Sequence, residues 1–363
     1  MSDVQPRIAA ERVRSNFDDL DADITVSRFE GDDAEWDRFV AAADGSTFSH
    51  RAGWHGIMTD VLRHECAYLV AKDARGAWHG VLPLVHVRGL LGHYLLSMPF
   101  LNDGGPLGSD LACRRLVEHA VGEAERSGAK LLELRARHDL AGPVASSNRK
   151  ITVHLPLPES IALLWEKTFK AKLRSQIRRP SKEGMVTRCG ADELHSFYRV
   201  FSRNMRDLGT PVLPRLLFEQ LASVFGNDIL FTTVYTADGT AAAAACSLVW
   251  QDEVEIVWAS SLREYNRLSP NMLLYARAIE ESIVRGARVF NFGRCTLGSA
   301  THKFKLQWGG YDVPLPWPAW TRDGGAGTPS PDSPIMALAA SIWSRLPMMI
   351  ANRVGPLLSR HLP

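Results

Sequence analysis

The sequence predicts a mixed α/β protein that contains two copies of one unit in tandem, followed by a short helical tail. Two observations carry this prediction. Strand-like and helix-like segments alternate along most of the chain. In addition, residues 68–85 resemble residues 232–249, and residues 127–137 resemble residues 285–295. With 363 residues, 45% of them hydrophobic, the chain is long enough for two domains.

The expected elements follow the same order in both halves. Each half begins with a hairpin whose turn contains Asp and Gly, and continues with a strand, a helix and a final strand. In the first half we expect strands at 66–72, 79–87, 93–98, 131–135 and 150–155, and a helix at 110–127. In the second half we expect strands at 228–236, 241–250, 253–261 and 288–292, and a helix at 270–285.

This order is the one expected of GNAT-type acyltransferases. In that fold, the free backbone N–H groups at the start of the helix hold a phosphate-bearing acyl donor. In the second half, Ser269 is the expected N-cap and Pro270 the expected first-turn residue of the helix. Neither half contains the Q/R-x-x-G-x-G/A loop of ordinary acetyl-CoA-binding members.

The predicted organisation has five parts. They are a polar lead-in (1–23), a first GNAT-like subdomain (24–155), a second GNAT-like subdomain (156–320), a Gly/Pro/Ser-rich linker (321–334) and an amphipathic C-terminal tail (335–363).

The tail places apolar residues on one helical stripe and adds arginines. The stripe consists of Ile335, Leu338, Ala339, Ile342, Trp343 and Leu346, and the arginines are Arg345, Arg353 and Arg360. Pro347 should kink or end the first helical segment. The pattern fits either a contact with a membrane surface or packing against the body of the protein.

Composition excludes several classes of function. A net charge of +2 argues against a protein that coats nucleic acid, and we expect no DNA partner. The five cysteines form no C-x-x-C pair and the twelve histidines no spaced cluster, so neither a disulfide framework nor a metal site is expected. The N-terminus lacks an apolar signal region and no stretch approaches 18 apolar residues. We therefore expect a cytoplasmic protein, peripheral to the inner membrane if the tail contacts a membrane surface instead of packing against the body.

The stretch NFGRCTLGSATHKFKLQWGG (291–310) gathers cations beside an apolar strand. Lys303 and Lys305 fit either a solvated face or a catalytic site, with Phe304 and Trp308 either in the core or beside that site. Arg294 follows a glycine and fits either a phosphate or carboxylate ligand, or an ion pair with Glu280 or Glu281.

Three further groups have both a structural and a functional interpretation. Asn204, Arg206 and Asp207 fit either an acceptor groove or, for the last two, an internal network. In the basic helix around 170–182, Arg174 and Arg178 share one face, which fits either an anionic ligand or a solvated surface. Glu133 and Arg135 fit either a structural ion pair or substrate binding.

Seven segments carry a resemblance to a known family. They are GVLPLVHVRGLLGHYLLSMPF (80–100), LLELRAR (131–137), KLRSQIRRPSKEGM (172–185), NMRDLGTPV (204–212), SPNMLLY (269–275), NFGRC (291–295) and FKLQWG (304–309). On these, the chain resembles the FemAB-like family, specifically its exosortase (PEP-CTERM)-associated subgroup, over roughly residues 24–318. It differs in having Cys295 where serine is common, and in lacking the long helical arm of tRNA-using members.

The resemblance implies two tandem GNAT-like subdomains and transfer of an aminoacyl group from aminoacyl-tRNA to an amine of a cell-wall precursor. It further implies that Lys305 stabilises the oxyanion and that Phe304 excludes water. The third expected catalytic residue is Arg294, which would hold an anionic group. The expected substrate-binding residues are Asn204, Arg206, Asp207, Asn271, Lys303, Trp308, Arg174 and Arg178.

The sequence therefore predicts an N-acyltransferase that acts on an envelope or exopolysaccharide precursor. No permanently bound cofactor is expected, and the anionic acyl donor is either an aminoacyl-tRNA or an acyl-CoA. The alternatives are a non-catalytic GNAT-like scaffold and a plain acyl-CoA-dependent acetyltransferase. If Lys305 is a surface lysine of the cleft, Lys305→Ala should abolish transfer and leave the thermal midpoint nearly unchanged.

Overall fold

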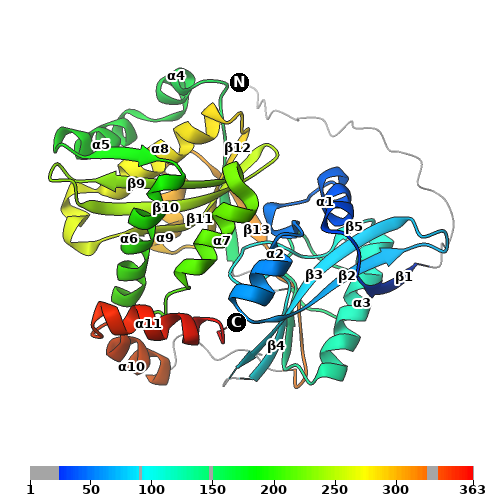
Figure 1. Cartoon of the computed structure of the whole chain (residues 1–363). Coiled ribbons are helices and arrows are strands. Elements are labelled where there is room, and N and C mark those ends of the chain that lie inside the picture. The colour runs from blue at the N-terminus through cyan, green and yellow to red at the C-terminus, as the bar shows by residue number, and fades with distance from the viewer. Residues whose placement is uncertain (1–23, 90–91, 147–149, 325–333, 363) are drawn as a thin grey trace.

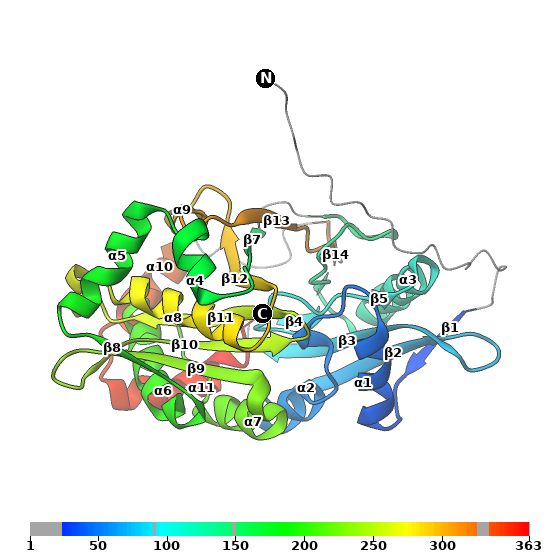
Figure 2. The same ribbon diagram turned by 90° about the horizontal axis from the view of Figure 1, so that it is seen from above.

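The structure is a computed structural model that describes residues 24–89, 92–146, 150–324 and 334–362. These residues form two seven-stranded mixed sheets that lie beside each other (Figures 1 and 2). The predicted mixed α/β class, with two repeated units and a helical tail, is confirmed. The predicted lead-in (1–23) and most of the predicted linker (325–333) lie outside the described residues.

The first sheet has the strand order β1-β2-β3-β4-β6-β14, with β5 paired to β3. All neighbours are antiparallel except β4 and β6, which run parallel. The strands are β1 (Thr25–Arg28), β2 (Glu65–Lys72), β3 (Trp78–Gly89), β4 (Gly92–Leu96), β5 (Leu107–Gly108), β6 (Leu131–Glu133) and β14 (Ala319–Thr321).

The second sheet has the strand order β13-β7-β12-β11-β10-β9-β8. Here too one pair is parallel, namely β11 and β12. The strands are β7 (Lys150–Pro156), β8 (Val186–Cys189), β9 (Ile229–Tyr235), β10 (Ala241–Trp250), β11 (Glu253–Ser261), β12 (Val289–Thr296) and β13 (Tyr311–Leu315).

The two halves repeat the predicted order of elements. A hairpin (β2–β3, then β9–β10) is followed by a strand, a helix and a parallel strand, with α3 (Asp110–Ser127) and α8 (Pro270–Val284) as the helices. The α3 helix has the predicted bounds, because Ser109 accepts a hydrogen bond from Ala112 N and Gly128 ends the helix at φ +75°. Pro270 begins α8 as predicted, whereas Ser269 has φ +56° and makes no side-chain cap.

The two sheets exchange strands near the ends of the units. The strand β7, expected in the first unit, pairs with β12 and β13 in the second sheet. Conversely, β14 returns to the first sheet and pairs with β6. The predicted division at residue 155 therefore placed β7 in the wrong sheet, because a period-two apolar pattern identifies a strand and does not identify its partners.

Helices cover both sides of the paired sheets. In Figure 2, α3, α5 and α8 lie on one side, and α1, α2, α6 and α7 lie on the other. One buried cluster contains Trp36 and Tyr68 of the first unit together with Phe218 and Trp258 of the second, so the units share a core. The remaining helices of the body are α1 (Asp33–Ala42), α2 (Trp54–Gly56), α4 (Ile161–Leu163), α5 (Ala171–Lys182), α6 (Leu194–Asp207), α7 (Arg215–Phe225) and α9 (Ala300–Leu306).

The tail forms two helices, α10 (Pro334–Trp343) and α11 (Met348–Ser359), on the underside of Figure 1. Pro347 lies between them, as predicted. Arg206 Nη1 donates to Leu346 O at 3.0 Å, and His361 Nδ1 lies 2.8 Å from Arg88 O. The tail therefore packs against both units, which was one of the two interpretations of its sequence.

Candidate active site

A pocket of about 470 Å³ lies where β11 and β12 separate. These strands pair only between Glu253–Glu255 and Val289–Asn291, and their later residues line the pocket. Both units and the tail contribute to its lining, with Asn102, Met205, Ile256, Phe292, Arg294, Lys305, Ser359 and Leu362 among the residues.

Lys305 reaches this pocket from α9 as a buried ammonium. Its Nζ donates to Gly293 O at 2.6 Å and to Arg294 O at 2.9 Å, and the residue is only 3% exposed. Burial lowers the pKa of Lys305 to about 8. An ammonium has three N–H bonds, and the third has no acceptor among the residues that the structure describes. The earlier assumption of a surface lysine is therefore wrong, because the side chain is enclosed by the β12 backbone.

The backbone of β12 is shaped to receive this lysine. Gly293 has φ +69°, and a Cβ at this position would lie 2.7 Å from Ile256 O. The register of β12 against β7 shifts between Asn291 and Arg294, which turns the carbonyl groups of 293 and 294 out of the ladder. The hydroxyl of Thr152 contacts the Asn291 side chain and lies 2.9 Å from Gly293 O.

Arg294 provides a second cation in the pocket. Its guanidinium lies over the Trp317 ring at 4.9 Å from the ring centroid, and Arg135 lies over the same ring at 4.8 Å. Arg135 is held by Glu133 (3.1 Å) and by two carbonyl groups, which is the structural pair that the sequence offered as one interpretation.

The guanidinium of Arg294 has no hydrogen-bond or acidic partner among the described residues. The suggested pairing with Glu280 or Glu281 is wrong, because both acids contact Arg277. Desolvation and the nearby Arg135 charge lower the pKa of Arg294 to about 10, although solvent still reaches its side chain. An arginine without an acidic partner, beside a second arginine, favours binding of an anion.

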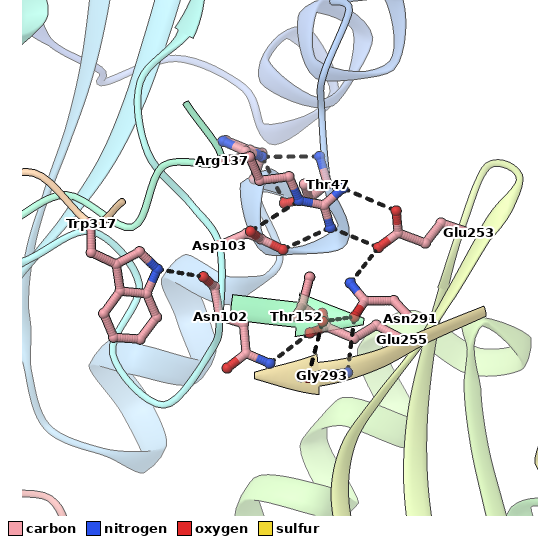
Figure 3. Close-up of polar contacts among 11 residues, drawn as sticks. Thr47, Asn102, Asp103, Arg137, Thr152, Glu253, Glu255, Asn291, Gly293 and Trp317 are labelled. Atoms are coloured by element: carbon pink, nitrogen blue, oxygen red, sulfur yellow. Dashed lines mark hydrogen bonds and ion pairs between the residues drawn. The ribbon is translucent and has the colours of Figure 1, made fainter. Parts of the chain in front are cut away.

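Glu255 and Asn102 were not identified from the sequence. Asn102 Nδ2 donates to Glu255 Oε1 at 2.6 Å, and Asn102 lines the pocket (Figure 3). Burial, followed by the charge of Asp103, raises the pKa of Glu255 to about 8. A usable signal existed: the EVEIVW strand (253–258) places Glu253 and Glu255 on one face of an otherwise apolar strand.

A charged network ties the two units together beside this pair (Figure 3). Arg137 donates to Asp103 at 3.0 and 2.8 Å, and to Glu253 at 3.0 and 2.7 Å. Asn291 Nδ2 donates to Glu253 Oε1 at 2.8 Å. The network therefore fixes β11 and β12 of the second unit against the loop after β4 of the first unit.

The aromatic neighbours of Lys305 differ in their exposure. Trp308 is fully buried among Phe169, Tyr275 and Phe292, so its predicted contact with substrate is wrong and it packs the core. Phe304 is half-buried, with its ring centroid 5.0 Å from that of Tyr275. Lys303 is exposed on α9.

The predicted groove residues on α6 mostly contact other parts of the protein. Asn204 Nδ2 donates to Ser260 Oγ at 3.1 Å, beside the pocket residue Met205. Arg206 and Asp207 form an ion pair at 2.7 Å, and Arg206 also binds the tail. This is the internal network that the sequence offered as the alternative to substrate binding.

The two predicted arginines of α5 differ in their contacts and in their exposure. Arg174 Nη1 donates to the carbonyl groups of Trp165 and Phe169 at 2.8 and 3.0 Å, so it stabilises the preceding turn. Arg178 is exposed, with its guanidinium 5.6 Å from the centroid of the Trp165 ring. The structure therefore favours Arg178 over Arg174 as an accessible cation.

A second pocket, of about 430 Å³, lies at the start of α8. Asn271 lines it, together with Gln176, Arg179, Ser269, Phe304 and Gln307. The first backbone N–H groups of a helix have no partners within the helix, which favours an anion at this end. Phe304 borders this pocket while its neighbour Lys305 borders the first, so α9 separates the two pockets.

The fold is that of a protein built from two GNAT-like units. Residues 167–305 match the family described as acetyltransferase (GNAT) domain. No curated protein matches the sequence. No helix among the described residues has the length and apolar character needed to cross a membrane.

Solved structures with a similar fold cover most of the chain at low identity. FemX is 13% identical with a TM-score of 0.59, covering 81% of this chain and 97% of FemX. The C-terminal domain of a protein assigned as a lysylphosphatidylglycerol synthetase from Agrobacterium fabrum is 13% identical with a TM-score of 0.53, covering 86% and 97%. A tandem GNAT protein from the clavulanic acid biosynthesis pathway is 14% identical with a TM-score of 0.52, covering 85% and 99%. At such identities the likeness shows the fold alone.

Proposed function

We propose that this chain is an N-acyltransferase that moves an aminoacyl group to an amine of a cell-envelope or exopolysaccharide precursor. The observation that carries the proposal is the buried ammonium of Lys305, which lines a pocket beside Arg294 and has one N–H bond left after its two carbonyl contacts. The exosortase-associated subgroup, suggested by the sequence segments, remains part of this proposal.

The proposed reaction forms a C–N bond and breaks the bond between the acyl carbon and the donor oxygen or sulfur. Attack by the amine gives a tetrahedral oxyanion, which the remaining N–H of Lys305 stabilises. With a pKa of about 8, Lys305 is mostly protonated at pH 7 and can donate. The proton of the attacking amine passes to the carboxylate form of Glu255, which is the minor form at pH 7 and is bonded to the pocket residue Asn102.

The anionic groups of the donor are proposed to bind at the start of α8, beside Asn271 and Arg179, with its acyl group reaching past α9 to the pocket of Lys305. The likeness to FemX and to a lysylphosphatidylglycerol synthetase supports an aminoacyl donor. The family match of residues 167–305 supports an acyl-CoA as the second candidate. Because the usual glycine loop is missing, we expect weak binding of acetyl-CoA.

An acyl-transfer screen with both donor classes tests the proposal. The full chain is incubated with aminoacyl-tRNA or acyl-CoA and with amine-bearing envelope precursors, and products are detected by mass. An aminoacylated product that disappears in Lys305→Met supports the proposal. Micromolar binding of acetyl-CoA by calorimetry, about −8 kcal/mol, would favour the second candidate. If neither donor gives a product, the non-catalytic scaffold is the better description.

A further inference from the structure

The tail helix α11 has an unusual distribution of side chains. Its small residues Ala351, Gly355 and Ser359, spaced by four, form the buried stripe. A Cβ at Gly355 would lie 2.9 Å from Val212 Cγ1, so this stripe lies directly against the body. A surface helix ordinarily buries its large apolar residues, whereas α11 buries its small ones.

The large apolar residues of the tail face solvent instead. On α11, Ile350, Val354, Leu357 and Leu358 recur at the spacing of one helical stripe, and all are exposed. Met349 is 78% exposed, and Leu338 and Ile342 on α10 continue the pattern four residues apart. Of the fifteen large apolar side chains that are exposed in the described residues, seven lie in the tail. Such a concentration marks an interaction surface.

The charge of the tail indicates what covers this surface. Residues 334–363 contain no Asp or Glu, and they contain Arg345, Arg353 and Arg360. Just after α11, Arg360 and His361 line a pocket of about 340 Å³ together with Arg63, Arg88 and a single acid, Glu65. An apolar stripe flanked by arginines, with no acid, is complementary to a bilayer that carries anionic headgroups.

We infer that α10 and α11 dock the protein on an anionic membrane surface, with the exposed apolar stripe inserted among the lipids. Because Ser359 and Leu362 of the tail also line the pocket of Lys305, docking places that pocket within about one helix diameter, roughly 10 Å, of the bilayer surface. The site would then receive an acceptor that is anchored in the membrane, a precursor with a lipid tail. The docking itself does not depend on the proposed transferase activity, so its test needs no turnover.

Co-sedimentation with vesicles tests the docking. The full chain should bind vesicles of phosphatidylcholine mixed with phosphatidylglycerol, should bind pure phosphatidylcholine much less, and should be released by salt. Ile350→Ser combined with Leu357→Ser should lower the partition coefficient between vesicles and water by about tenfold or more. Both substitutions remove an apolar side chain that would insert among the lipids. The matched control, Val186→Ser with Val284→Ser, changes two exposed apolar residues outside the tail and should bind as the parent does.

The charges are tested separately. Arg345→Gln with Arg353→Gln should weaken binding to the anionic vesicles by about fivefold per charge, whereas Arg75→Gln on the β2–β3 turn should not. All these side chains are exposed, so thermal midpoints should stay the same. Absence of binding by the parent chain, or full binding by Ile350→Ser with Leu357→Ser, overturns the inference. A dimer in sedimentation equilibrium that the same double variant dissociates would also overturn it, because a second copy would then cover the stripe.

Discussion

The ammonium of Lys305 lies 2.6 Å from the carbonyl oxygen of Gly293, inside the bulge that separates β12 from β7. The lysine therefore does two things at once: it satisfies two main-chain carbonyl groups and it keeps a cation at the pocket. Its role in stability and its role in chemistry have to be separated by the choice of substitution.

Lys305→Met should reduce acyl transfer by roughly 10² to 10³, because it removes one oxyanion donor while keeping the length of the side chain. Lys305→Arg should restore only part of the rate, since a planar guanidinium cannot replace both carbonyl contacts. With the pKa of Lys305 at about 8, the parent rate should fall above pH 8, and Lys305→Arg should lack this alkaline fall. Single-turnover rates across pH measure both effects; an unchanged rate in Lys305→Met would remove the lysine from the mechanism.

Glu255→Gln should change how stability depends on pH. The folded pKa of Glu255, about 8, is above its ordinary value of 4.5, so the folded state favours the protonated carboxyl group. The contribution of Glu255 to the free energy of unfolding is complete below pH 4.5 and is lost as pH rises through 8. Relative to Glu255→Gln, the parent should therefore lose up to about 1.4 kcal/mol of unfolding free energy per pH unit in this window. Urea unfolding at pH 5 and pH 8 gives the difference, and parallel pH curves would contradict the assignment.

Arg294→Gln and Arg135→Gln should behave differently although both arginines lie over Trp317. Arg294 has no acidic partner among the described residues, so its substitution should weaken binding of an anionic ligand by about tenfold and leave the thermal midpoint nearly the same. Arg135 is buried, with Glu133 and two carbonyl groups as partners, so its substitution should lower the midpoint. Equal loss of stability in both variants would count against an anion site at Arg294.

Arg137→Met should destabilise the protein by about 3–5 kcal/mol, because it leaves Asp103 and Glu253 without their cation. Asp103 is only 3% exposed, so water cannot take over its solvation. The exposed pair of Arg203 and Glu264 supplies the control: Arg203→Met should cost less than about 1 kcal/mol. Chemical denaturation measures the unfolding free energy of both variants. Equal, small losses would show that the network of Arg137, Asp103 and Glu253 is not needed for stability.

Local signals were sufficient for most elements. The helix at 110–127 and the break at Pro347 were predicted correctly, because caps and prolines act within a few residues. The pairing of β14 with β6 was not predictable, because the apolar pattern of a strand does not identify a partner strand that is distant in the sequence.

The site was predicted less well than the fold. Lys305 and Arg294 do line one pocket, as the sequence grouping suggested. Trp308 was misplaced because an aromatic residue before a glycine pair has the same pattern in a core as at a cleft. Glu255 was missed because its neighbours are apolar, and only the three-dimensional position of Asn102 connects it to the pocket.

The return of β14 to the first sheet has a consequence for biosynthesis. The first sheet remains without its final edge strand until residues 319–321 leave the ribosome, by which time the whole second unit has been made. Domains that are contiguous in sequence fold in order as they emerge. Here the amino-terminal half must wait in an incomplete form, so a nascent chain arrested near residue 300 should be far more sensitive to protease in its first half than the released protein.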